Sequence, residues 1–157
     1  MRTMLGWLFS KPLEPGTPAP DFTLPDQYGS KVTLSSLGGR NVILVFYPGD
    51  DTPFCVKQLC QFRDHRTYLS EQNALIFGIN PQSASSHAKF RDKFRLPFPL
   101  LVDKNQAVGK LYRTKSLIVR RTVYLIGPDG IVRFAKRGAP NPSEVLAAAV
   151  LAKASHP

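Results

Sequence analysis

Residues 42–64, VILVFYPGDDTPFCVKQLCQFRD, carry the strongest pattern in this chain. The first six are apolar and mostly β-branched or aromatic, which is typical of a strand buried on both faces of a sheet. The turn-forming residues PGDDTP then interrupt the run. From Pro53 onward, apolar residues recur every three or four positions, which predicts a helix that ends near Ser70. A central strand that leads through a tight turn into a helix indicates an α/β fold.

Strands and helices continue to alternate along the rest of the chain, with no internal repeat, which predicts an α/β sandwich. Residues 21–37 predict two short strands around a turn that contains glycine. The other predicted strands are residues 74–79, 98–103, 121–126 and 131–135, the last two forming a hairpin across GPDG. The other predicted helices are residues 80–95, 105–111 and a final helix that Asn141 caps, with Pro142 at its first position.

The length of 157 residues suits one folded domain with a real core. We expect residues 1–14 to be an N-terminal extension and residues 15–157 to form the domain. No apolar run approaches the roughly 20 residues that span a bilayer. A short apolar patch at residues 4–9 lacks the features of a signal peptide, with weak contact to a membrane surface as the minor alternative. We therefore expect a cytoplasmic protein without a membrane span.

The chain is strongly basic, with a formal net charge of +10. Such a charge attracts anions without specificity. The basic residues are scattered instead of gathered in one tail, and no nucleic-acid-binding motif is present. We expect a solvated basic surface and no specific nucleic-acid partner. A non-catalytic basic binding module is the alternative, and salt-dependent binding of nucleic acid would indicate it.

Two cysteines cannot form a disulfide-dense scaffold. A metal site needs more ligands, and the histidines show no ligand spacing to the cysteines or to one another. We therefore expect no metal or other cofactor and structural or surface places for the three histidines. The cysteines remain either catalytic or two unrelated core thiols. The histidines are His65, His87 and His156.

Cys55 occupies a position that favours its thiolate form. Thr52 is a good N-cap and Pro53 suits the first helical position, so Cys55 becomes the third helical residue. Unpaired backbone N–H groups and the positive end of the helix dipole stabilise an anionic sulfur there. The local sequence thus predicts a reactive thiol, with an inert buried thiol as the alternative.

Cys60 follows Cys55 by five residues. In an intact α-helix this spacing means a rise of about 7.5 Å and a rotation of about 140°. The two Cα atoms then lie roughly 8 to 9 Å apart, whereas a disulfide needs at most about 7 Å. Either the two sulfurs never bond, or the helix unwinds locally whenever they do.

The motif P-x-x-x-T-x-x-C, formed by Pro48, Thr52 and Cys55 after an apolar strand, resembles that of the peroxiredoxin family. Cys60 is similar to the second cysteine of the peroxiredoxin Q or bacterioferritin comigratory protein branch. The stretches APDFTLPDQYG, QFRD and RTVYLIGPDGIVR extend the resemblance over residues 15–151. It implies a thioredoxin-like fold, in which helices flank a central mixed β-sheet and an N-terminal β-hairpin precedes it.

The resemblance also implies a thiol-dependent peroxidase that reduces hydrogen peroxide and organic hydroperoxides. Cys55 would be the peroxidatic cysteine, with Arg121 as its cationic partner. Thr52 would hydrogen-bond the peroxide, and Pro48 would wall the pocket. Cys60 would be the resolving cysteine, which forms an intramolecular disulfide that thioredoxin or a similar dithiol reduces. The branch favours a monomer.

Two features differ from the family pattern or leave a choice open. The segment between LLVD and RTVYLI is short, so the loop before the arginine strand can differ from that of longer relatives. Arg120 and Arg121 are adjacent, and only one can face the thiolate because neighbouring strand residues point to opposite faces. Counting back from LIGPDG favours Arg121, with Arg120 at the surface. A thioredoxin-type oxidoreductase is the rival enzyme, but TPFC lacks its C-x-x-C motif.

Overall fold

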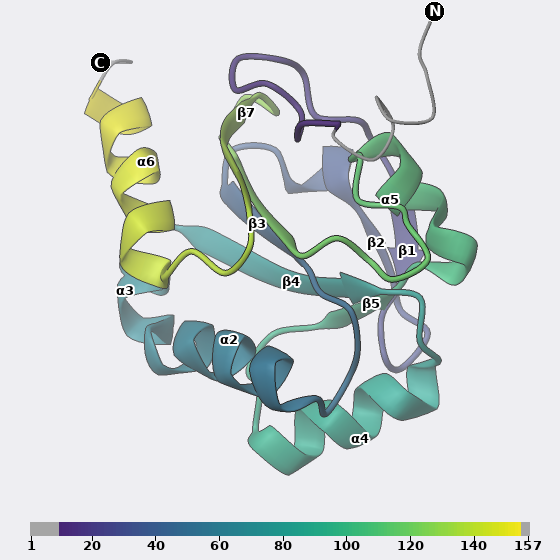
Figure 1. Ribbon diagram of the computed structural model, residues 1–157. Coiled ribbons are helices and arrows are strands. Elements are labelled where there is room, and N and C mark those ends of the chain that lie inside the picture. Colours follow the sequence, from purple (N-terminus) through teal and green to yellow (C-terminus); the bar gives the residue numbers. More distant parts are fainter. Residues whose placement is uncertain (1–9, 155–157) are drawn as a thin grey trace, which may run out of the picture.

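The computed structural model describes the backbone of residues 10–154 and the side chains of residues 10–151. Its centre is a five-stranded mixed sheet in the order β5-β4-β3-β6-β7 (Figure 1). The middle strand β3 runs parallel to β4 and antiparallel to β6. The strands are β3 (Asn41–Phe46), β4 (Ala74–Asn80), β5 (Leu100–Val102), β6 (Thr122–Ile126) and β7 (Val132–Arg137). The central position predicted for the strand at residues 42–47 is confirmed.

A two-stranded hairpin precedes the sheet. Its strands are β1 (Thr23–Pro25) and β2 (Lys31–Thr33), which pair antiparallel. Gly29 has a φ of 84° in the turn between them, a conformation that glycine adopts without steric cost. The hairpin predicted from residues 21–37 is therefore confirmed.

The alternation of side chains along β3 divides the core between two faces of the sheet. Ile43, Val45 and Tyr47 belong to one apolar cluster, and the intervening residues belong to the other. The first face is covered by α2 (Pro53–Asp64), α3 (Arg66–Glu71), α4 (Ala84–Phe94) and α6 (Pro142–Ala154) (Figure 1). The second is covered by the hairpin, η1 (Leu34–Leu37) and α5 (Ala107–Leu111), which follows η2 (Lys104–Gln106).

The helix predicted to run from Pro53 to Ser70 is wrong in one respect, because it breaks at His65. The φ and ψ angles of His65 are −101° and 12°. Its ring nitrogen Nδ1 lies 2.8 Å from the carbonyl oxygen of Gln61, and its backbone N–H turns to Phe62 instead. A side chain that takes the carbonyl of the preceding turn competes with the helical ladder.

The cap of the last helix is confirmed, since Asn141 Oδ1 accepts from the Glu144 N–H at 2.9 Å.

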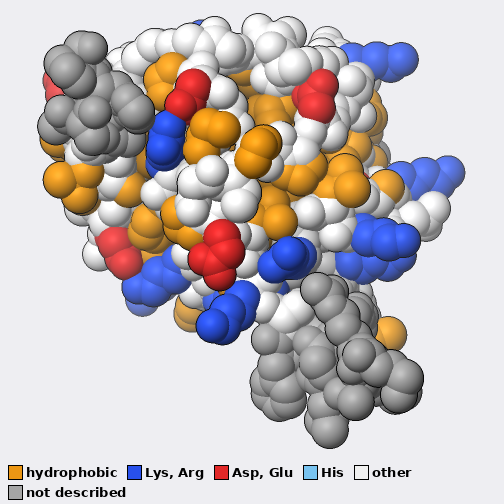
Figure 2. Space-filling model, turned by 90° about the horizontal axis from the view of Figure 1, so that it is seen from above, with side chains coloured by type: hydrophobic (Ala, Val, Ile, Leu, Met, Phe, Trp, Pro, Cys, Tyr) orange, Lys and Arg blue, Asp and Glu red, His pale blue; other side chains and the backbone are white. Residues whose placement is uncertain are grey.

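Basic side chains are spread among apolar and acidic ones over the face seen in Figure 2, as the scattered sequence positions predict. Within residues 10–154, no helix combines the length and the apolar character that crossing a bilayer requires. The apolar patch predicted at residues 4–9 and the histidine at position 156 lie outside the described residues.

Candidate active site

The chain reaches Cys55 through a short loop between β3 and α2. Thr52 is the N-cap of α2, with an extended backbone, and Pro53 takes the first helical position. The N-cap position predicted for Thr52 is confirmed, although its side chain makes no capping hydrogen bond. Its hydroxyl instead donates back into the loop, to the Gly49 carbonyl oxygen at 3.4 Å. Cys55 is the third residue of the helix and is fully buried.

Arg121 meets the sulfur because of the strand order. Phe46 at the end of β3 pairs with Thr122 at the start of antiparallel β6. The residue before Thr122 therefore stands beside the point where the chain leaves β3 towards α2. Its guanidinium nitrogen Nη2 donates to Cys55 Sγ at 3.1 Å. Arg120 turns elsewhere, is half-buried, and donates to the Ser10 hydroxyl at 3.5 Å, so it is Arg121 that contacts the sulfur.

Two further contacts fix the orientation of the Arg121 guanidinium. Nη1 donates to Gln58 Oε1 at 2.6 Å, and the guanidinium lies over the Phe54 ring at 4.4 Å from its centre. Phe54 is 58% exposed, so it covers the arginine on the solvent side. A guanidinium held on several sides presents its charge to the sulfur in one orientation.

Gln58 is a site residue that the sequence analysis missed. It follows Cys55 by three residues, and residues at this spacing share one face of a helix, which is the signal that could have found it. Arginine only donates, so the atom that faces Arg121 is the amide oxygen. The amide nitrogen is buried and has no partner among the described residues. Because Gln58 is neutral, it holds Arg121 without neutralising the charge that faces the sulfur.

Along the chain, Pro48 precedes Cys55 and Cys60 follows it. Pro48 is half-buried at the start of the loop, directly after the buried Tyr47. Cys60 is half-buried on the same helix and packs against the apolar cluster that contains Cys55. Both cysteines are free thiols, and α2 is continuous from Pro53 to Asp64. Two unbonded cysteines are what the spacing predicts for an intact helix. The roles of Cys55 and Cys60 in catalysis stay predictions.

Residues 15–135 match the AhpC/TSA family. The chain belongs to this family. It is 40% identical over 129 residues to a putative peroxiredoxin Bcp of Coxiella burnetii, a match that covers 76% of this chain and 85% of that protein. It is 35% identical to peroxiredoxin Bcp of Bacillus subtilis, over 75% of this chain and 81% of that protein. The match to the chloroplastic peroxiredoxin Q of japonica rice, at 39% identity, spans 76% of this chain and 57% of the rice protein.

Solved structures agree with this assignment. Peroxidoxin BcpB of Mycobacterium tuberculosis superposes with a TM-score of 0.83 at 31% identity, covering 88% of this chain and 97% of that one. Peroxiredoxin Q of Xanthomonas campestris gives 0.75 at 26% identity, covering 85% and 90%. The chain is a peroxiredoxin of the Bcp and peroxiredoxin Q branch, a thiol-dependent peroxidase with the predicted thioredoxin-like fold. A peroxide substrate and a thiol reductant follow from that membership.

The loop of this peroxiredoxin also contains a buried carboxylate, which the sequence analysis did not single out. The Asp50 side chain is 3% exposed and accepts four hydrogen bonds. Its Oδ1 accepts from the Tyr47 hydroxyl at 2.6 Å and from Asn80 Nδ2 at 3.1 Å. Its Oδ2 accepts from the Ser86 hydroxyl at 2.7 Å and from His87 Nδ1 at 2.6 Å. One loop residue is thereby joined to the ends of β3 and β4 and to α4.

We expect Asp50 to make the stability of the protein sensitive to acid. Burial by itself raises the pKa of this carboxyl, but the hydrogen bonds from His87, Tyr47 and Ser86 outweigh burial and lower the pKa below its ordinary value. A lowered pKa stabilises the fold above the unfolded-state value of about 3.9, and this stabilisation is lost as the pH falls through the folded-state value.

The free energy of unfolding, measured with denaturant at a series of pH values, should therefore fall below about pH 5 and reach its lowest values under strong acid. An Asp50→Asn variant lacks this titration and should show a shallower dependence on pH in the same window. Equal slopes in the two proteins would contradict the assignment.

Proposed function

We propose that this peroxiredoxin reduces hydroperoxides with Cys55 as the attacking sulfur. The thiolate displaces one peroxide oxygen, the O–O bond breaks, and the departing oxygen takes a proton and leaves as water or alcohol. Cys55 is left as a sulfenic acid. The observation that carries the proposal is the Arg121 nitrogen at 3.1 Å from a fully buried sulfur. Its fixed charge stabilises both the thiolate and the charge that develops on the oxygens.

Thr52 and Pro48 complete the proposed pocket. The Thr52 hydroxyl makes no capping bond, and its only described contact is a long one to Gly49, so it is available to hydrogen-bond the peroxide. Pro48 limits access of water at the start of the loop. The backbone N–H groups of the first helical turn, near Phe54 and Cys55, have no intrahelical acceptor and can bind the reacting oxygens.

Cys60 is the proposed resolving cysteine. Its sulfur attacks the sulfenic sulfur of Cys55, an S–S bond forms, and the hydroxyl leaves as water. The helical spacing requires α2 to unwind between the two residues first. A dithiol reductant, for which thioredoxin is our candidate, then supplies two electrons and restores both thiols. A monomer suffices for this cycle, and a cytoplasmic location, which would supply such a reductant, stays a prediction.

Replacing Cys60 with serine should leave the first turnover intact and stop recycling by thioredoxin. The variant keeps the Cys55 site, so one equivalent of peroxide should be consumed per protein at about the wild-type rate. Stopped-flow measurement of the burst, followed by a thioredoxin-coupled assay, separates the two steps. Mass spectrometry of the oxidised wild type should find one disulfide between residues 55 and 60 within a single chain. A variant that cycles normally with thioredoxin would refute the resolving role.

A further inference from the structure

His87 holds Asp50 through a buried pair of hydrogen bonds. The imidazole is completely buried; Nδ1 faces the Asp50 carboxylate at 2.6 Å and Nε2 faces the Leu101 carbonyl oxygen at 2.9 Å. Each ring nitrogen thus has one oxygen within hydrogen-bond distance, on the loop at one side and on β5 at the other. Asp50 and His87 therefore form a hydrogen-bonded pair inside the protein. Removing the nitrogen that faces Asp50 would leave a buried carboxylate oxygen with one hydrogen-bond partner fewer.

This pair joins the loop to α4 and to the central sheet. Leu101 belongs to β5, which pairs with β4 in the central sheet. The backbone N–H of Asp50 donates to the side-chain oxygen of Gln82, and the Gln82 N–H donates to Asn80 Oδ1 at 2.8 Å. Both the main chain and the side chain of Asp50 are thus attached at the edge where the parallel strands end.

Asp50 lies shortly before the residues that form the reactive site. Asp50 precedes Thr52 by two residues and Cys55 by five. Asp51 has a φ of 55°, a left-handed conformation, so the chain changes direction directly after Asp50. Burial raises the pKa of the Tyr47 phenol, and the charges of Asp50 and Cys55 raise it further. The phenol therefore stays protonated and keeps its bond to Asp50.

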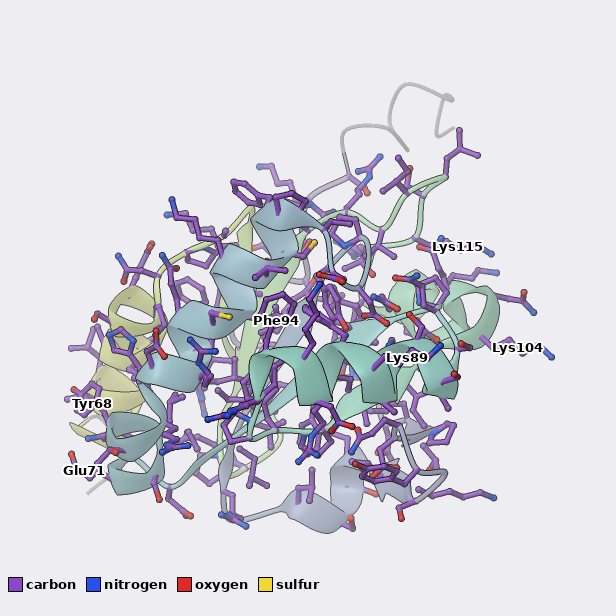
Figure 3. All side chains as sticks on the ribbon, turned by 90° about the horizontal axis from the view of Figure 1, so that it is seen from below. Tyr68, Glu71, Lys89, Phe94, Lys104 and Lys115 are labelled. Atoms are coloured by element: carbon purple, nitrogen blue, oxygen red, sulfur yellow. The ribbon has the colours of Figure 1, made fainter. Side chains whose placement is uncertain are left out.

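The stretch of chain that begins at Asp50 and carries both cysteines is also attached at its other end, at Arg63. Arg63, near the end of α2, donates from Nη1 to the Phe94 carbonyl oxygen at 2.6 Å. Phe94 ends α4 and lies between α2 and α4 in Figure 3. Both cysteines therefore lie on a stretch of chain whose two ends are bound to α4, at His87 and at Phe94.

We propose that the hydrogen-bonded pair of Asp50 and His87 is a positioning pair for the peroxidase reaction: it sets Thr52 and Cys55 in place against Arg121, and it stays formed while α2 unwinds beyond it. The inference rests on the proposed function of Cys55. The pair touches no substrate and acts through the loop. Its loss should slow the attack of Cys55 on peroxide without slowing the later formation of the disulfide, because the unwound segment no longer depends on the loop geometry.

Two neutral amide variants of His87 test the pair. In His87→Asn, the amide nitrogen takes the place of Nδ1 and keeps a donor to Asp50, while the contact with Leu101 is lost. In His87→Gln, the amide nitrogen takes the place of Nε2 and keeps a donor to Leu101, while the contact with Asp50 is lost. The rate of the peroxide burst and the rate of disulfide formation are measured separately, together with the unfolding midpoint of each variant.

We expect His87→Gln to react with hydrogen peroxide about 10- to 100-fold more slowly than His87→Asn, the scale of a reacting group displaced by about 1 Å. Disulfide formation should be no slower in His87→Gln. A purely structural role would lower the unfolding midpoints and leave the two burst rates equal, which would overturn the proposal. If His87→Gln does not fold, Asp50→Asn replaces it, because it changes the carboxylate that faces His87: a burst slowed several-fold supports the pair, and an unchanged burst overturns it. Absence of a burst in the wild type would refute the proposed function of Cys55 instead.

Discussion

Replacing Cys55 with serine should abolish peroxide reduction, lowering the second-order rate constant by about 10³-fold or more. A serine hydroxyl stays protonated at neutral pH beside the same arginine and the same helix terminus, so the nucleophile is lost while the surroundings remain. Stopped-flow consumption of hydrogen peroxide measures the effect. Since serine is close in size to cysteine, the unfolding midpoint should change little.

Cys60→Ser is the matched control for this variant. It makes the same chemical change on the same helix, five residues further on, and should retain the first turnover. A Cys55→Ser protein that still shows a burst, or a pair of variants that fail equally, would mean that Cys55 is not the attacking sulfur.

Replacing Arg121 with glutamine should slow the first turnover by about 100- to 1,000-fold. The change removes a charged donor that lies 3.1 Å from the sulfur, and loss of one donor at a developing charge typically costs this much in rate. The first turnover of Arg121→Lys should be slower than that of the wild type and faster than that of Arg121→Gln. Lysine keeps the charge, but a point charge cannot contact both Cys55 and Gln58 as the guanidinium does. The rate of the peroxide burst as a function of pH is the measurement.

Arg120→Gln provides the control, because it removes the same charge from the adjacent residue, which contacts Ser10 and not the sulfur. We expect its burst rate to stay within about twofold of the wild type, as for a charge outside the site. Equal losses in the two glutamine variants would show that overall charge, and not the contact with Cys55, determines the rate.

The local part of the site could be predicted because short-range interactions create it. An apolar run makes β3, a proline fits the first turn of α2, and the helical register then puts Cys55 where backbone N–H groups are unpaired. The hairpin at Gly29 and the cap at Asn141 are local in the same sense. The break at His65 is also local, but it depends on which carbonyl a histidine ring selects, and apolar spacing does not contain that information.

The contacts that assemble the site around Cys55 join residues far apart along the chain. Arg121 lies 66 positions after Cys55, and His87 lies 37 positions after Asp50. Family resemblance pointed to Arg121, but no periodicity in the sequence connects either pair. Gln58 is close in sequence, yet its role depends on Arg121 being there to donate to it.

By itself, the sequence determined that this peroxiredoxin carries a cysteine in the first turn of a helix, with a second cysteine beyond disulfide reach while that helix is whole. The tertiary structure alone decided what surrounds the sulfur. Antiparallel pairing of β3 with β6 brings Arg121 to the end of β3, and the parallel edge of β3, β4 and β5 brings Asn80 and His87 to Asp50. Backbone propensities act over a few residues, whereas the order of strands in a sheet is set by burial of the whole core.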